Sequence, residues 1–123
     1  MRAFFLRAVE ALPLAVFLIY MAVADPRADL AALLRRIRAL LARPTTNLLR
    51  TPYNTVQEAL DDFDSYIRDV ESGTDKRLHE LGVLFLPTSE LQDLAIDSGW
   101  GDEFLEIADA YDAIMPALRK HRP

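Results

Sequence analysis

The stretch DPRADLAALLRRIRALLARP (residues 25–44) decides the fold of this chain. Asp25 followed by Pro26 predicts a helix start, because Asp accepts hydrogen bonds from the free amides of a first turn and Pro has no N–H to leave unpaired there. Apolar residues then recur every three or four positions, on one face of an α-helix: Leu30, Leu33, Leu34, Ile37, Leu40 and Leu41. Four arginines lie away from that face: Arg35, Arg36, Arg38 and Arg43. We therefore expect a basic amphipathic helix that Pro44 ends.

The four arginines of this helix have two interpretations. They form a surface that lies on an anionic membrane or grips an acidic partner, or they are the solvated face of a helix in a bundle. Of the two, we favour the bundle interpretation.

A second apolar segment, ALPLAVFLIYMAVA (residues 11–24), precedes this helix and has no charged residue. Residues 3–23 have the roughly 20 residues that a transmembrane helix needs, provided that Arg7 and Glu10 sit at the interface. The basic start and the Ala-Val-Ala sequence at residues 22–24 also fit a cleaved signal peptide, and the short run fits a buried bundle helix. If the segment spans a bilayer, the arginines that follow it place the rest of the chain at the cytoplasmic face. All three alternatives stay open.

The charge of the chain divides at residues 44–52 (PTTNLLRTP), where prolines, threonines and an asparagine indicate a linker. Residues 1–50 carry eight arginines against three acids, a net charge of +5, and residues 51–123 carry sixteen acids against six Lys and Arg, a net charge of -10. We therefore expect hydrophobic and basic N-terminal helices in residues 1–43 and an acidic helical domain in residues 53–123. The two halves are either complementary to each other or made for two different neighbours.

The acidic part also has the pattern of helices. Asn54 with Gln57 predicts a helix start, Gly73 predicts its end, and the apolar stripe between them is Val56, Leu60, Phe63, Ile67 and Val70. A short helix is expected over residues 75–81, ending at Gly82, and residues 83–87 (VLFLP) are expected to be a buried extended connector or the exposed edge of a recognition groove.

Two further helices are expected after this connector. Thr88 or Ser89 caps a helix that runs to about Asp97, and Asp102 opens the last one, which Pro116 should kink or end near Met115. The apolar stripe of the last helix is Phe104, Ile107, Ala108, Tyr111, Ile114, Met115 and Leu118.

The segment LQDLAIDSGWGDEFLEIADAYD (residues 91–112) has the spacing of a helix-turn-helix. Its second helix presents acids, however, and phosphate would be repelled, so nucleic-acid binding is excluded. The acidic face, with Asp102, Glu103, Glu106 and Asp109, suits a basic protein partner instead. Trp100, between Gly99 and Gly101, is either an exposed anchor for that partner or the packing residue of a helical corner.

Little in the sequence suggests catalysis or metal binding. The chain has no Cys, which removes thiolate nucleophiles and Cys-type metal sites, and it has no Gly-rich phosphate loop and no paired Glu-x-x-His motif. Of the two histidines, His121 is near the end of the chain, so a small enzyme or metal protein would centre on His79, with Asp75 or the hydroxyls of Thr88 and Ser89.

The sequence thus predicts an all-α protein, a small bundle of about five helices: a hydrophobic N-terminal helix and a basic amphipathic helix, followed by an acidic helical domain. We expect a non-catalytic accessory or adaptor protein without metal or cofactor, which binds a basic protein partner through its acidic face. The N-terminal helices would serve membrane attachment or a homo-oligomer seam, in the cytoplasm or at the cytoplasmic face of a membrane. The alternatives are an inhibitor of the immunity or antitoxin kind, acting by charge mimicry, and the enzyme centred on His79.

Overall fold

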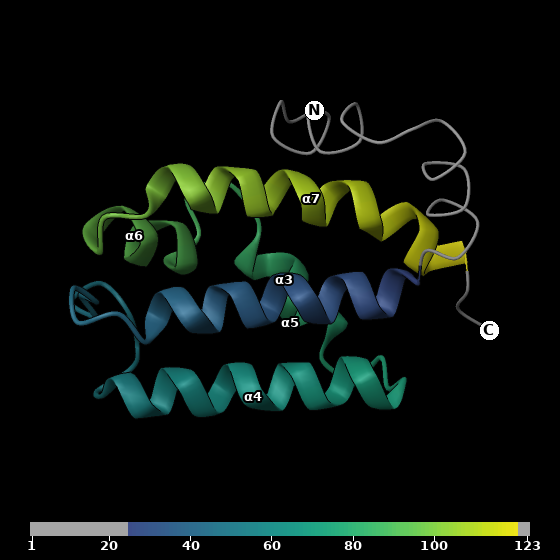
Figure 1. The fold of residues 1–123 in the computed structure, drawn as a ribbon, viewed down its shortest axis with the longest axis horizontal. Coiled ribbons are helices and arrows are strands. Elements are labelled where there is room, and N and C mark those ends of the chain that lie inside the picture. Colours follow the sequence, from purple (N-terminus) through teal and green to yellow (C-terminus); the bar gives the residue numbers. More distant parts are fainter. Residues whose placement is uncertain (1–24, 121–123) are drawn as a thin grey trace, which may run out of the picture.

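The computed structural model describes residues 25–120, which form five α-helices and no strand (Figure 1). The helices are α3 (Pro26–Leu41), α4 (Val56–Ser72), α5 (Leu78–Leu84), α6 (Glu90–Asp97) and α7 (Gly101–Lys120). The all-α prediction is confirmed for this part of the chain. The hydrophobic helix expected at residues 3–23 and His121 lie outside the described residues. Within residues 25–120, no helix combines the length and the apolar character needed to cross a bilayer.

The central helix of the fold is α3, and it begins as predicted. The carboxylate of Asp25 accepts a hydrogen bond from the Arg27 amide at 2.9 Å, and Pro26 occupies the first turn. Leu33 of its predicted apolar face is only partly buried, and six residues of the helix are buried in the core: Leu30, Ala31, Leu34, Ile37, Leu40 and Leu41. Helices α4 and α7 lie on either side of α3 and run antiparallel to it, whereas they hardly touch each other (Figure 1). The core is therefore built around α3.

The N-terminal cap of helix α4 lies one residue later than predicted. Thr55, and not Asn54, caps the helix: its hydroxyl accepts from the Glu58 amide at 3.1 Å, and the Glu58 carboxylate accepts from the Asn54 amide at 2.9 Å. The arrangement differs from a capping box, because Glu58 bonds to the amide of Asn54, the residue before the cap, and not to the amide of Thr55 itself. The predicted end is confirmed, because Gly73 adopts a left-handed conformation with φ 83°. The buried face consists of Ala59, Phe63, Tyr66, Ile67 and Val70.

The prediction for residues 75–87 is wrong in three respects. Helix α5 begins at Leu78 and not at residue 75, because residues 76 and 77 form a turn. It does not end at Gly82 but continues to Leu84, and Gly82 has no positive φ that would interrupt the helix. Residues 83–87 are not a buried extended connector: they form the last helical turn and the bends that follow, and Val83 and Leu86 are about half exposed. Only Phe85 is fully inserted, where its ring stacks on Tyr111 with a centroid distance of 4.1 Å. This contact holds α5 against α7.

Helices α6 and α7 meet at a sharp corner. Ser89 caps α6 as predicted, and its hydroxyl accepts from the Gln92 amide at 3.1 Å. Gly99 has φ 87°, which allows the chain to reverse, and α7 then begins at Gly101, one residue before the expected Asp102. Pro116 does not end α7, which runs on to Lys120. Pro116 and Asp112 are both exposed, so water can reach the Asp112 carbonyl that a proline four residues later leaves without a donor.

Candidate protein-binding surface

Three of the four predicted surface arginines pair with acids of neighbouring helices. Arg38 contacts both carboxylate oxygens of Asp64 on α4, at 2.5 and 3.1 Å. The other pairs are Arg35–Glu71 at 2.6 Å and Arg36–Glu106 at 3.4 Å. All six side chains are about a third to a half exposed, so solvent screens each pair and its contribution to stability is small. The charges of α3 are thus complementary to those of α4 and α7, while Arg43 is exposed.

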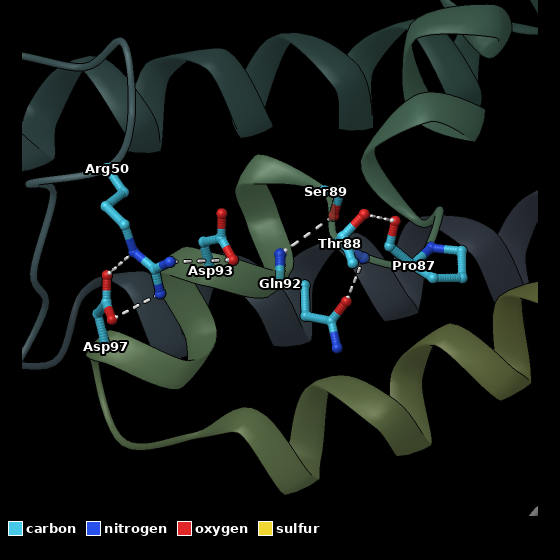
Figure 2. Close-up of polar contacts among 7 residues, drawn as sticks. All are labelled: Arg50, Pro87, Thr88, Ser89, Gln92, Asp93 and Asp97. Carbon is cyan, nitrogen blue, oxygen red and sulfur yellow. Dashed lines mark hydrogen bonds and ion pairs between the residues drawn. The ribbon is translucent and has the colours of Figure 1, made fainter.

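The loop between α3 and α4 holds the end of α6 in place. The guanidinium of Arg50 forms two hydrogen bonds to Asp97, at 2.8 and 2.9 Å, and lies 3.4 Å from Asp93 (Figure 2). These bonds keep the pKa of Asp97 below its usual value. The buried hydroxyl of Ser98 accepts from the Asn47 amide at 2.8 Å, and the Ser98 carbonyl accepts from Thr45. The corner between α6 and α7 is therefore fixed from one side by residues 45–50.

The other end of α6 is fixed by a strained turn. Thr88 has φ 62°, a left-handed conformation that a β-branched residue rarely adopts. The side chain of Gln92 reaches back to accept a hydrogen bond from the Thr88 amide at 2.6 Å, and the Thr88 hydroxyl donates to the Pro87 carbonyl at 2.6 Å (Figure 2). These contacts, with the Ser89 cap, set the direction of α6.

Acids dominate the surface of α6 and of the first half of α7. Residues 90–112 contain eight Asp and Glu and no Lys or Arg. Asp93 and Asp97 are paired with Arg50, and Glu106 with Arg36. Within residues 25–120, the structure records no ion pair for three of the others, Asp102, Glu103 and Asp112. Negative charge is thus left uncompensated on this side of the described molecule.

Exposed apolar side chains accompany these acids. Ile96 on α6 is 55% exposed and Leu105 on α7 is 53% exposed. Ile96 lies beside the first turn of α7, because a Cβ on Gly101 would come within 3.2 Å of its Cγ1, and Leu105 follows Gly101 by one helical turn. A shallow hollow beside Ile96 is lined by Gly99, Gly101, Asp102 and Glu103. We call this region the corner surface, defined by Ile96, Gly99, Gly101, Asp102, Glu103 and Leu105.

The predicted binding residues do not all belong to the corner surface. Asp102 is exposed and Glu103 half-buried there, whereas Glu106 is turned toward α3 and paired with Arg36. Asp109 is exposed farther along α7. Trp100 is fully buried, in agreement with the interpretation that it is the packing residue of the corner. Its indole Nε1 has no hydrogen-bond partner within residues 25–120.

Sequence reasoning missed Ile96 and Leu105 as surface residues. Leu105 falls outside the apolar stripe of α7, and this offset was a usable signal that it faces solvent. Ile96 offers no such signal, because its exposure depends on how α6 meets α7.

A polar cluster around Arg77 was also missed by sequence reasoning. Arg77 donates to Asp62 at 2.9 Å and to Glu80 at 3.1 Å, and its guanidinium lies over the Tyr66 ring, 3.9 Å from the centroid. Tyr53 donates to the second oxygen of Asp62 at 2.6 Å. Burial raises the pKa of Tyr66 to about 12. Because these groups pair with one another, the cluster joins α4 to α5.

The residues of the catalytic or metal-binding alternative are not brought together. His79 is exposed on α5, and Asp75 is held by Arg27 at 2.7 Å. The hydroxyl of Ser89 donates to the Leu84 carbonyl at 2.6 Å and caps α6. Within the described residues, no three His, Cys, Asp or Glu side chains gather in a way that could hold a metal ion.

The described geometry therefore provides one candidate site, an acidic surface with exposed apolar side chains at a helical corner that Arg50, Asn47 and Thr45 hold through hydrogen bonds. Comparison of the chain with protein-family models, with curated proteins and with solved structures finds no match.

Proposed function

We propose that this protein is a non-catalytic accessory or adaptor protein that binds a basic protein partner through the corner surface. The observation that carries the proposal is the acidic surface of residues 90–112, where three of the eight acids pair with Arg36 or Arg50. Within the described residues, the structure records no ion pair for Asp102 and Glu103 beside the exposed Ile96 and Leu105. Uncompensated charge supplies attraction and orientation, and the apolar side chains supply contact area that excludes water.

The chemistry of the surface favours a protein over other classes of partner. Nucleic acids and anionic membranes carry phosphates, which the carboxylates of Asp102 and Glu103 repel. A protein with Lys or Arg around an apolar centre matches both the charge and the exposed Ile96 and Leu105.

The fixed position of the corner also supports this function. Arg50 and Ser98 join the end of α6 to the loop that follows α3, and buried Trp100 fills the turn. A surface that is already ordered loses little conformational freedom on binding, so more of the contact energy remains as affinity.

The proposal can be tested by comparing three forms of the full chain as bait in a lysate of the organism that encodes it. The forms are the wild type, Asp102→Asn with Glu103→Gln, and a control with Glu58→Gln and Asp61→Asn, which removes two charges from α4. We expect a basic protein that the wild type and the control retain and that the corner variant loses. With the purified partner, the corner variant should bind about tenfold more weakly.

Salt provides the second readout, because charges at a surface are screened over about 8 Å at physiological ionic strength. The affinity for the purified partner should fall as salt rises, and it should fall less steeply for the corner variant. Equal retention of the same proteins by all three forms would contradict the proposal. If binding abolishes an activity of the partner, the function is inhibition of the immunity or antitoxin kind through the same contact.

A further inference from the structure

We infer that the partner presents a basic amphipathic α-helix, which lies along α7 from the corner surface toward Asp112. This inference rests on the proposed function and specifies the shape of the ligand. It comes from the exposed side of α7, which continues the corner surface along the helix.

Four exposed residues of α7 follow one another at intervals of three, four and three positions: Asp102, Leu105, Asp109 and Asp112. This spacing places them on one face of the helix, away from the face that carries the buried Phe104, Ile107 and Tyr111. We call this face the outer stripe. Its ten residue steps extend for about 15 Å, which is nearly three turns of helix. Ile96 widens its apolar part at the corner end.

A helix fits this stripe better than other protein elements. An extended peptide binds by adding a strand to a sheet edge, and residues 25–120 contain no strand. A helix binds by placing apolar residues at helical spacing against an apolar strip, with its charged residues beside them. The outer stripe offers such an arrangement, with Leu105 and Ile96 as the apolar contact and carboxylates on both sides of it.

The molecule already contains one contact of this kind. Helix α3 is basic and amphipathic, lies antiparallel to α7, and places Arg36 against Glu106 at 3.4 Å. On its other side, Arg38 holds Asp64 on α4. The acidic helices α4 and α7 therefore pack their inner faces against α3, a helix of leucines and arginines. The outer stripe is also acidic and has an apolar residue at its centre. Because the negative stripe is complementary to a positive ligand, we expect it to bind a helix that, like α3, carries leucines and arginines.

The test uses a synthetic peptide of about 18 residues, long enough to cover the stripe as a helix, with Arg beside Leu at intervals of three and four. A second peptide has the same composition in shuffled order, without an amphipathic face. Binding to the full chain is measured by isothermal titration calorimetry, and the site is mapped by changes in amide NMR shifts. We expect the patterned peptide to bind at least tenfold more tightly than the shuffled one and to shift the amides of α7 around Leu105.

Variants locate the contact. Leu105→Ala and the pair Asp102→Asn with Asp112→Asn should each weaken the patterned peptide about tenfold, while Glu58→Gln with Asp61→Asn on α4 should leave it unchanged. Circular dichroism of each variant verifies that its helix content is retained.

The outcomes separate this inference from the proposed function. If both peptides bind with equal affinity, and this binding is lost in the variant with Asp102→Asn and Asp112→Asn, the helical ligand is overturned. A basic partner would still be supported by that result. Shifts that map to α4, or affinity unaffected by the α7 variants, overturn the outer stripe as the site. No binding of either peptide overturns the helical ligand, while retention of a basic protein by the wild-type bait would still support the proposed function.

Discussion

Replacement of Thr88 by Gly should stabilise the protein, although it removes a side chain. Thr88 has φ 62°, and a left-handed conformation costs a non-glycine residue on the order of 1–3 kcal/mol. Glycine removes this cost, but its greater freedom in the unfolded chain returns about 0.5–1 kcal/mol. The Thr88 amide keeps its bond to Gln92, and the exposed hydroxyl loses only a local bond to Pro87. We therefore expect a net gain of about 1 kcal/mol in the free energy of unfolding.

Urea denaturation followed by circular dichroism measures this gain, which corresponds to a rise in Tm of about 4–8 °C for a domain of this size. The reverse change provides the control. Gly73 has φ 83°, and a Cβ there would meet nothing within 4 Å, so Gly73→Ala should lose about 1 kcal/mol through backbone conformation alone. Thr88→Ala keeps a Cβ and should gain less than Thr88→Gly. A Thr88→Gly variant that is less stable than the wild type would refute the reasoning, because the strain would then be outweighed by contacts of the side chain.

Three further perturbations test the packing and the titrating groups of the fold. Ile37→Ala should cost about 2–5 kcal/mol in chemical denaturation, because Ile37 is completely buried in the central helix. The pKa of Tyr66 is raised to about 12, so its contribution to the free energy of unfolding is complete below pH 10 and is lost as the pH rises toward 12. In denaturation experiments at a series of pH values, Tyr66→Phe should therefore reduce the fall in stability between about pH 10 and 12. The pKa of Asp64 is lowered by its bond to Arg38, so that pair stabilises the fold above about pH 4 and is lost at lower pH. Asp64→Asn should therefore lower the thermal midpoint at pH 7 and bring it closer to that of the wild type below pH 3.

The helix boundaries predicted most accurately from the sequence depend on local chemistry. Two helices begin at the caps Asp25 and Ser89, and one ends at Gly73. Each of these caps bonds to residues close by in the chain, so a short window of sequence is enough to predict it. Helix α5 was misjudged because glycine permits a positive φ without requiring one, and Gly82 stays helical. The position of Phe85 depends on stacking with Tyr111, which is distant in the sequence.

The candidate site could be predicted in its charge but not in its extent. The acids of α7 are evident from composition, and the absence of Lys and Arg from residues 90–112 predicts a basic ligand. Which of those acids are compensated depends on tertiary pairing, as with Glu106 and Arg36, which are separated by 70 residues. The exposure of Ile96 depends on the angle between α6 and α7, and this angle is set by Arg50 and buried Trp100.

The central place of α3 has a consequence for synthesis of the chain. A ribosome that adds about 5–20 residues per second needs about 4–14 s to proceed from Arg36 to Glu106. During this interval α4 can cover one side of α3. The side that α7 will cover remains exposed, and its leucines can associate with apolar segments of other chains. Chaperones that bind nascent apolar segments should therefore engage α3 until α7 is complete, and slow codons between α4 and α7 should increase aggregation more than slow codons after Leu118.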